Sequence, residues 1–178
     1  YTYLNSAECK DYFHFLKDNL EDIYYSSYFA EVAEYFTMEG QDERNILNLL
    51  FVTFLAMKKK LIPLSLIRRI YELKILQFAG FGLQCFQCVH CGNDENLIRI
   101  SFEDGGMLCS TCAAKGQGRA VDPSVLYVLQ FVSSVPLNQL YSFALKETIE
   151  KEFEWIVNRY FTIHVEHKFK SAEMLAIL

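Results

Sequence analysis

The sequence has no apolar run long enough to cross a lipid bilayer. Its longest apolar stretch, residues 46–57, is interrupted by Asn48 and Thr53, and a membrane-spanning helix needs about 20 apolar residues. This stretch is therefore typical of a buried core helix. We expect no membrane partner. The sequence also lacks a signal-peptide pattern, and the missing initial Met indicates a fragment or a processed form.

Catalytic signatures are also missing. No glycine-rich phosphate-binding loop follows a predicted strand, there is no G-x-S-x-G sequence, and no Ser, His and acidic residues form a recognisable group. His164 and His167 lie three residues apart without a third metal ligand nearby in sequence, so we expect solvated surface histidines. The sequence gives no positive support for an enzyme, and we predict a non-enzymatic protein.

Apolar side chains, by contrast, are plentiful enough for a sizeable core. Hydrophobic residues make up 52% of the chain, including 15 Phe and 11 Tyr, and charged residues make up 22%; these proportions argue against disorder over most of the length. A chain of 178 residues is typical of one domain, with or without a small appendage.

Apolar residues at helical spacing occur on both sides of a segment rich in glycine and cysteine. Helices are predicted over residues 21–37, 42–59, 63–80 and 122–136. A further amphipathic helix carries apolar side chains on one side, at Ile149, Phe153, Ile156, Val157, Tyr160 and Phe161. We expect the two groups of helices to pack together.

The segment between these helices differs in kind. Apolar and polar residues alternate over 98–102, as in a short strand, Gly105-Gly106 predicts a turn, and Met107-Leu108 can pair back as a second strand. We therefore predict a mainly α fold with an inserted four-cysteine zinc-finger hairpin. Residues 1–80 supply the N-terminal helices of a helical domain, residues 81–119 form the finger, and residues 120–178 supply the C-terminal helices of the same domain.

Five of the six cysteines fall between Cys85 and Cys112, in C-x-x-C spacing. A chain with this much apolar material does not need disulfides for stability, and clustered C-x-x-C pairs in a reducing cytosol indicate a metal site. Zinc prefers four soft or borderline ligands in a tetrahedron, which two such pairs can supply.

The first pair is ambiguous, because Cys85, Cys88 and Cys91 are each three residues apart. Gly92, directly after Cys91, allows the positive φ of a tight turn. Val89, directly after Cys88, could adopt a positive φ only at a steric cost. We therefore predict one structural zinc ion with four cysteine ligands, Cys88, Cys91, Cys109 and Cys112.

Other interpretations of the cysteine cluster stay open. The cysteines could be reduced core thiols in a chain that has lost its metal, and His90 could replace one Cys as a ligand, although a histidine at this place is more often exposed. A catalytic zinc is disfavoured, because four cysteines leave no open position for water. Cys85 is expected to act as a small apolar residue, and the isolated Cys9 carries no functional prediction.

The net charge of −5 is unevenly distributed. Residues 1–57 carry 3 basic and 10 acidic side chains, residues 58–79 carry 6 basic and 1 acidic, and residues 80–122 carry 3 basic and 5 acidic. The run Lys58, Lys59 and Lys60 is therefore the candidate contact for nucleic acid, with weak and salt-sensitive binding. The alternative is that these lysines lie at the C-terminus of a helix, where their positive charges interact favourably with the helix dipole.

Several landmarks occur in a specific order along the chain. They are Tyr71-Glu72-Leu73-Lys74-Ile75-Leu76 with Gly80-Phe81, then Cys88-Val89-His90-Cys91-Gly92, then Ser101-Phe102 with Gly105-Gly106-Met107-Leu108-Cys109-Ser110-Thr111-Cys112, and finally Phe169-Lys170-Ser171 with Leu175. Over this stretch of about 100 residues, the chain resembles the C-terminal domain of the bacterial RecO family of DNA repair proteins.

The resemblance implies a helical domain with an inserted four-cysteine finger and a role in recombinational repair through the RecF pathway. Proteins of this family bind DNA and anneal complementary strands. They also contact the acidic tail of single-stranded-DNA-binding protein and act together with RecR to load the recombinase. The family's N-terminal OB barrel is not in this sequence, and the family usually has an apolar residue at the position of Cys85. We therefore expect a cytoplasmic, nucleoid-associated interaction module, and the alternative is a zinc-ribbon protein that binds nucleic acid directly.

Lys74 has an unusual position in the predicted helix over 63–79. At about 100° per residue, Ser65, Arg68, Arg69 and Glu72 share a face that should meet solvent, and Lys74 lies on the opposite, apolar face. One interpretation is an internal partner, such as an N-terminal acid, or a side chain that extends to water. The other is an apolar pocket where Lys74 binds the end carboxylate of an acidic peptide, with Arg68 and Arg69 attracting it from a distance.

Overall fold

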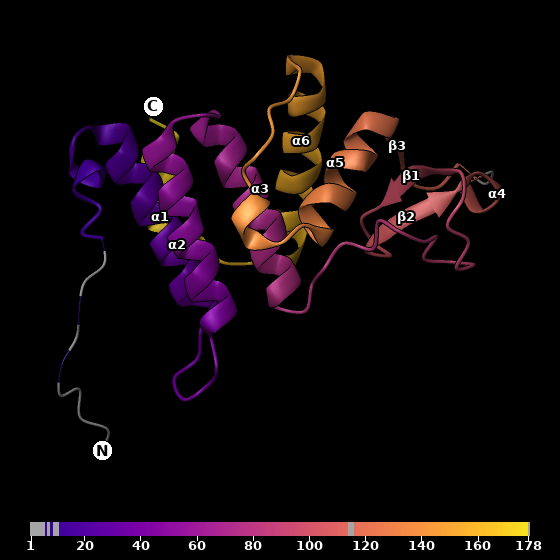
Figure 1. The fold of residues 1–178 in the computed structure, drawn as a ribbon. Helices are drawn as coiled ribbons and strands as arrows, with labels where there is room; N and C mark the ends of the chain where they lie inside the picture. Colours follow the sequence, from indigo (N-terminus) through magenta and orange to yellow (C-terminus); the bar gives the residue numbers. More distant parts are fainter. Residues whose placement is uncertain (1–5, 7, 9–10, 114–115, 178) are drawn as a thin grey trace.

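The computed structural model of the chain describes residues 6, 8, 11–113 and 116–177, which form helices and a small sheet. The helices are η1 (His14–Lys17), α1 (Leu20–Phe36), α2 (Arg44–Lys59), α3 (Leu64–Phe78), α4 (Ser110–Ala113), α5 (Pro123–Ser134), η2 (Leu137–Gln139), α6 (Glu147–His164) and α7 (Lys170–Leu175). The strands are β1 (Leu97–Ser101), β2 (Gly106–Cys109) and β3 (Arg119–Ala120). Figure 1 shows the sheet and α4 at one end of the helical part, and the predicted mainly α fold with an inserted four-cysteine hairpin is confirmed.

The predicted helices are present in the predicted order, with boundaries shifted by a few residues. Asp122 caps α5, because its carboxylate accepts a hydrogen bond from the N–H group of Ser124 at 2.7 Å. Helices α4 and α7 and the 3-10 turn η2 were not predicted, since segments of 4, 6 and 3 residues are too short to show a helical period. No helix in the described part of the chain is long and apolar enough to span a membrane.

Helix α3 is the centre of the helical part (Figure 1). It packs against α1, α2, α5 and α6, and its residues 70–76 are all buried, so every side of this stretch is covered. The predicted solvent face is therefore wrong for Glu72, and the other three residues of that face, Ser65, Arg68 and Arg69, are only partly exposed. Tyr28 of α1 contacts this side of the helix, and Glu72 has 0% exposed surface.

Glu72 is buried with a full set of hydrogen-bond donors. Its carboxylate accepts from Arg68 Nε at 2.8 Å, from Arg69 Nη1 at 2.6 Å and from the Tyr28 hydroxyl at 2.5 Å. Burial opposes the charge of Arg68, but the Glu72 carboxylate outweighs it and raises the Arg68 pKa. Tyr28 connects α1 to this network, because its hydroxyl donates to a buried carboxylate that would otherwise lack one of its hydrogen bonds.

The sheet has the strand order β2-β1-β3, and both pairs are antiparallel. The predicted β1–β2 hairpin is confirmed, whereas β3 and a bridge between Gln84 and Gly106 were not predicted. Gly106 permits this bridge, because a Cβ atom there would lie 2.5 Å from the Gln84 carbonyl oxygen. The bridge holds the segment before the first C-x-x-C pair against β2, which ends at Cys109.

One carboxylate of α1 forms hydrogen bonds with the start of the C-terminal helix α7. Glu31 of α1 accepts hydrogen bonds from the N–H groups of Lys170 at 3.0 Å and Ser171 at 2.9 Å, and also from the Ser171 hydroxyl. These are donors that the first turn of a helix leaves unsatisfied. Burial opposes the charge of Glu31, but these hydrogen bonds outweigh it and lower the Glu31 pKa.

Replacement of Glu31 by Gln should destabilise the protein by about 1 kcal/mol at neutral pH, as for other lost helix caps. Because the pKa of Glu31 is lowered by folding, its contribution is present above the ordinary value of 4.5 and is lost as the pH falls through the lower folded value. Urea unfolding at neutral pH should separate wild type from Glu31→Gln, and strong acid should remove the difference. A control Glu34→Gln, one turn further at an exposed position, should change little; an equal loss in the control would contradict this role.

Candidate metal centre and partner surfaces

Four cysteines converge at the end of the sheet. The Sγ atoms of Cys88, Cys91, Cys109 and Cys112 all lie within 4.8 Å of one another. The first two come from the turn after Gln84, Cys109 ends β2, and Cys112 lies in α4. Gly92 has a φ of +75°, and its N–H group donates to the Cys88 carbonyl at 2.8 Å. The tight turn that was expected after Cys91 is therefore present.

Backbone N–H groups favour ionised sulfur at two of these cysteines. Burial opposes ionisation of Cys88, but hydrogen bonds from the N–H groups of Cys109, Cys91 and His90 lower its pKa to about 6. The N–H group of Cys112 lowers the pKa of Cys109. Hydrogen bonding to Cys91, in contrast, raises the pKa of Cys112 to about 12. Four thiolates within 4.8 Å of one another would repel, and the donor set fits a thiolate-binding metal such as zinc.

His90 and Cys85 lie near the cluster but outside the group of four. His90 is exposed, as expected, and its Nε2 lies 3.0 Å from Asp104 Oδ2, which also accepts from the Ser101 hydroxyl at 2.6 Å. These contacts connect the first cysteine turn to the turn between β1 and β2. Cys85 is buried as expected, and its carbonyl accepts from Gln130 of α5 at 2.8 Å. Cys9 lies outside the described residues.

Two of the three consecutive lysines form ion pairs with aspartates. Lys58 Nζ lies 2.9 Å from Asp11 Oδ2, and Lys60 Nζ lies 3.5 Å from Oδ2 of Asp22, which is buried. All three lysines follow the last turn of α2 or lie within it, where cations are favourable. These contacts favour the interpretation that Lys58 and Lys60 stabilise the fold at the end of α2 over the interpretation that they bind nucleic acid.

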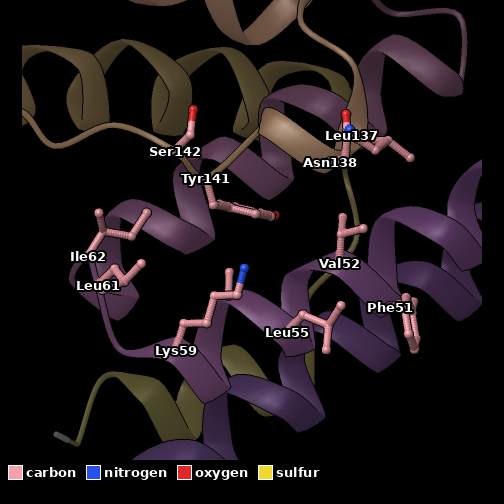
Figure 2. A pocket seen from close by; sticks show the side chains of 11 residues that line it. Phe51, Val52, Leu55, Lys59, Leu61, Ile62, Leu137, Asn138, Tyr141 and Ser142 are labelled. Carbon is pink, nitrogen blue, oxygen red and sulfur yellow. The ribbon is translucent and has the colours of Figure 1, made fainter. Parts of the chain in front are cut away.

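Lys59 lines an apolar cavity of ≈ 610 Å³ between α2 and the segment around η2. Figure 2 shows its ammonium group pointing into this cavity toward the Tyr141 ring. The walls are mainly apolar, with Phe51, Val52, Leu55, Leu61, Ile62 and Leu137. The Tyr141 hydroxyl lies 2.6 Å from Thr53 Oγ1 and so is held within the protein. Sequence reasoning missed this cavity, because its two sides lie about 80 residues apart in the chain.

Lys74 is buried with 5% exposed surface, and its ammonium group has an internal partner. It donates to the carbonyl oxygens of Val132 and Ser133, both at 3.1 Å, and of Val135 at 3.4 Å. These are C-terminal carbonyls of α5, which a helix leaves unsatisfied and which attract cations. Burial lowers the pKa of Lys74. The geometry favours the internal-partner interpretation, with a helix end in place of the acid that we expected.

Arg68 and Arg69 are also used within the fold. Both bind Glu72, and the Arg68 guanidinium lies over the Tyr28 ring, 4.4 Å from its centroid. Their side chains are 21% and 17% exposed, respectively. They therefore have little surface from which to attract a peptide.

A helical domain with an inserted four-cysteine finger defines the class of this protein (Figure 1). The sequence profile of the family described as "Recombination protein O C terminal" matches residues 17–173. The chain therefore belongs to the RecO C-terminal family, and the resemblance carried by its ordered landmarks is confirmed.

Its relatives include three proteins named DNA repair protein RecO. The one from Alkaliphilus metalliredigens is 25% identical over 174 residues, covering 96% of this chain and 71% of the relative. The one from Clostridium acetobutylicum is 27% identical over 176 residues, covering 98% and 71%. The one from Caldicellulosiruptor bescii is 27% identical over 168 residues, covering 94% and 68%. The family is thus one of recombination and DNA repair proteins.

Replacement of Lys74 by Met should destabilise the protein by about 1–3 kcal/mol, because the carbonyls at the end of α5 lose their buried donor. Urea unfolding followed by circular dichroism measures this change. The matched control is Lys151→Met in α6, where the side chain is 72% exposed, and it should change stability by less than about 0.5 kcal/mol. Equal stabilities of the two variants would contradict the structural role of Lys74.

Proposed function

We propose that this chain is a non-enzymatic interaction module of a recombination mediator in the RecF pathway. In this role it contacts the acidic tail of single-stranded-DNA-binding protein, the partner RecR, and DNA, and so supports strand annealing and recombinase loading in the cytoplasm, at the nucleoid. The observation that carries the proposal is the family match from residue 17 to residue 173, which includes both helical parts and the finger between them. Residues 81–119 are then an insert in one helical domain made of residues 1–80 and 120–178.

The finger is proposed to hold one structural zinc ion on Cys88, Cys91, Cys109 and Cys112. Zinc–sulfur bonds of about 2.3 Å in a tetrahedron place the sulfurs about 3.8 Å apart, and the four Sγ atoms already lie within 4.8 Å of one another. Four thiolates complete the coordination shell, so the metal would fix the two cysteine turns and leave no position for a substrate. Its chemistry in this role is to neutralise the crowded thiolates and stabilise the finger.

Native protein should contain one equivalent of zinc by elemental analysis, and Cys109→Ser should lose it. Because metal binding and local folding are coupled, hydrogen exchange in Cys109→Ser should accelerate over residues 85–113 while the helices stay largely protected. The control Cys85→Ser changes a cysteine outside the group of four and should keep its zinc. Native protein without bound metal would overturn the proposal, and iron in place of zinc would correct the identity of the metal.

The Lys59 cavity is the proposed site for the acidic tail. An acidic peptide that ends in Phe and a free carboxylate presents an aromatic ring and a charge side by side, and the cavity presents apolar walls beside an inward-pointing ammonium group (Figure 2). Phe51 and Leu61 are 44% and 74% exposed at its edge, so a ligand could cover apolar surface that water now contacts. Lys74 remains the alternative tail contact.

Lys59→Glu should weaken binding of a synthetic tail peptide by about tenfold or more, since it replaces a charge-assisted hydrogen bond by repulsion. Fluorescence anisotropy of a labelled peptide measures the affinity. Lys58→Glu is the matched control, with the same charge change on the adjacent residue, whose ammonium group binds Asp11. If both variants weaken binding equally, the effect is general electrostatics; if only Lys74→Met weakens it, the Lys74 alternative is correct.

A further inference from the structure

A stacked arginine and tryptophan lie where the finger meets the helices. The Arg119 guanidinium carbon of β3 is 3.7 Å from the centroid of the Trp155 ring in α6. Phe102, directly after β1, packs its ring edge-on to Trp155, with 5.8 Å between the centroids and 69° between the planes. The group combines two residues of the finger with one residue of the helical part.

Trp155 is unusually exposed for its position. It keeps 43% of its surface open to solvent, whereas its neighbours Ile156 and Val157 are fully buried. Tryptophan is among the most buried residues on average. Arg119 is also exposed, and no carboxylate among the described residues forms an ion pair with it. Arg119 covers one face of the indole ring, and the pair presents the remaining exposed part of the ring and a guanidinium group without an ion pair to solvent.

Two acidic residues close to this pair in the sequence, Asp122 and Glu152, bind backbone N–H groups at the start of α5. Asp122 accepts from the N–H group of Ser124 at 2.7 Å, and Glu152 accepts from the N–H group of Asp122 at 3.2 Å. Neither carboxylate forms an ion pair with Arg119. They still add negative charge close to the pair, which limits its attraction for a polyanion.

We propose that Arg119 and Trp155 form a stacking site for an unpaired base of single-stranded DNA, with Phe102 holding the indole ring in place. Bases stack on aromatic rings and on guanidinium planes without regard to sequence, and an adjacent arginine contacts the phosphate backbone. The site rests on the proposed function, in which DNA is a partner, and it names a contact other than the lysine run, where Lys58 and Lys60 are already paired.

The chain offers a direct probe, because Trp155 is its only tryptophan. Labelled oligodeoxythymidylate is titrated into the full, zinc-loaded chain at low salt, and two signals are recorded. Anisotropy of the label reports binding anywhere on the protein, and quenching of the tryptophan fluorescence reports stacking at Trp155. Both signals should follow one binding curve, and an oligonucleotide of abasic sites should bind more weakly without quenching.

Trp155→Ala and Arg119→Ala should each weaken binding by about tenfold in the anisotropy assay, and Trp155→Phe should retain most of the affinity. Ile163→Ala, at another exposed apolar position of α6 with 41% exposure, is the matched control and should bind as wild type. Binding without quenching, or unchanged affinity in Trp155→Ala, would overturn the stacking site and leave DNA as a partner at another surface. Absence of any anisotropy change would overturn both the site and the DNA contact.

Discussion

The helical part depends on two opposite charges that α3 carries into the interior. Glu72 is held by two guanidinium groups and the Tyr28 hydroxyl, and Lys74, two residues later, donates to the end of α5. An unpaired charge at either position would cost several kcal/mol, so each charge accepts only a narrow set of neighbours. Arg68 and Arg69 lie on α3 together with Glu72, so only the hydrogen bond from Tyr28 relates this charge to α1. The Lys74 ammonium group, whose partners are all on α5 or directly after it, determines which side of α3 faces the end of α5.

Much of the fold could be predicted because its signals are local. Apolar periodicity located the long helices, and the spacing of glycine and cysteine located the finger hairpin. The failures concern contacts between distant segments. A helical period shows that Arg68, Arg69 and Glu72 share a face but not that α1 covers it. The partner of Lys74 is a helix end about 60 residues away, and no sequence pattern marks it. The four cysteines that the sequence predicts as one group lie together, and Gly92 has the positive φ that their turn requires.

Several charged residues bind the backbone groups of helix ends. Glu31 binds the first turn of α7, Asp122 caps α5, and Lys74 binds the last carbonyls of α5. Helix termini attract such charges because their backbone groups lack partners. A charge without an ion pair is therefore the better guide to a ligand. Lys59 and Arg119 form no ion pair within the described part of the chain, and each lies beside exposed apolar or aromatic surface.

The finger and the helices form a continuous structure, which has a consequence for the metal. Cys85 receives a hydrogen bond from Gln130 of α5, and the Tyr160 hydroxyl of α6 approaches the turn at Gly105. Phe102 and Arg119, which contact Trp155, both belong to the finger. A metal that stabilises the cysteine turns would therefore also hold these two residues against α6. If the chain binds DNA as proposed, zinc would then strengthen DNA binding without contacting DNA, because it would keep Phe102 and Arg119 in contact with Trp155.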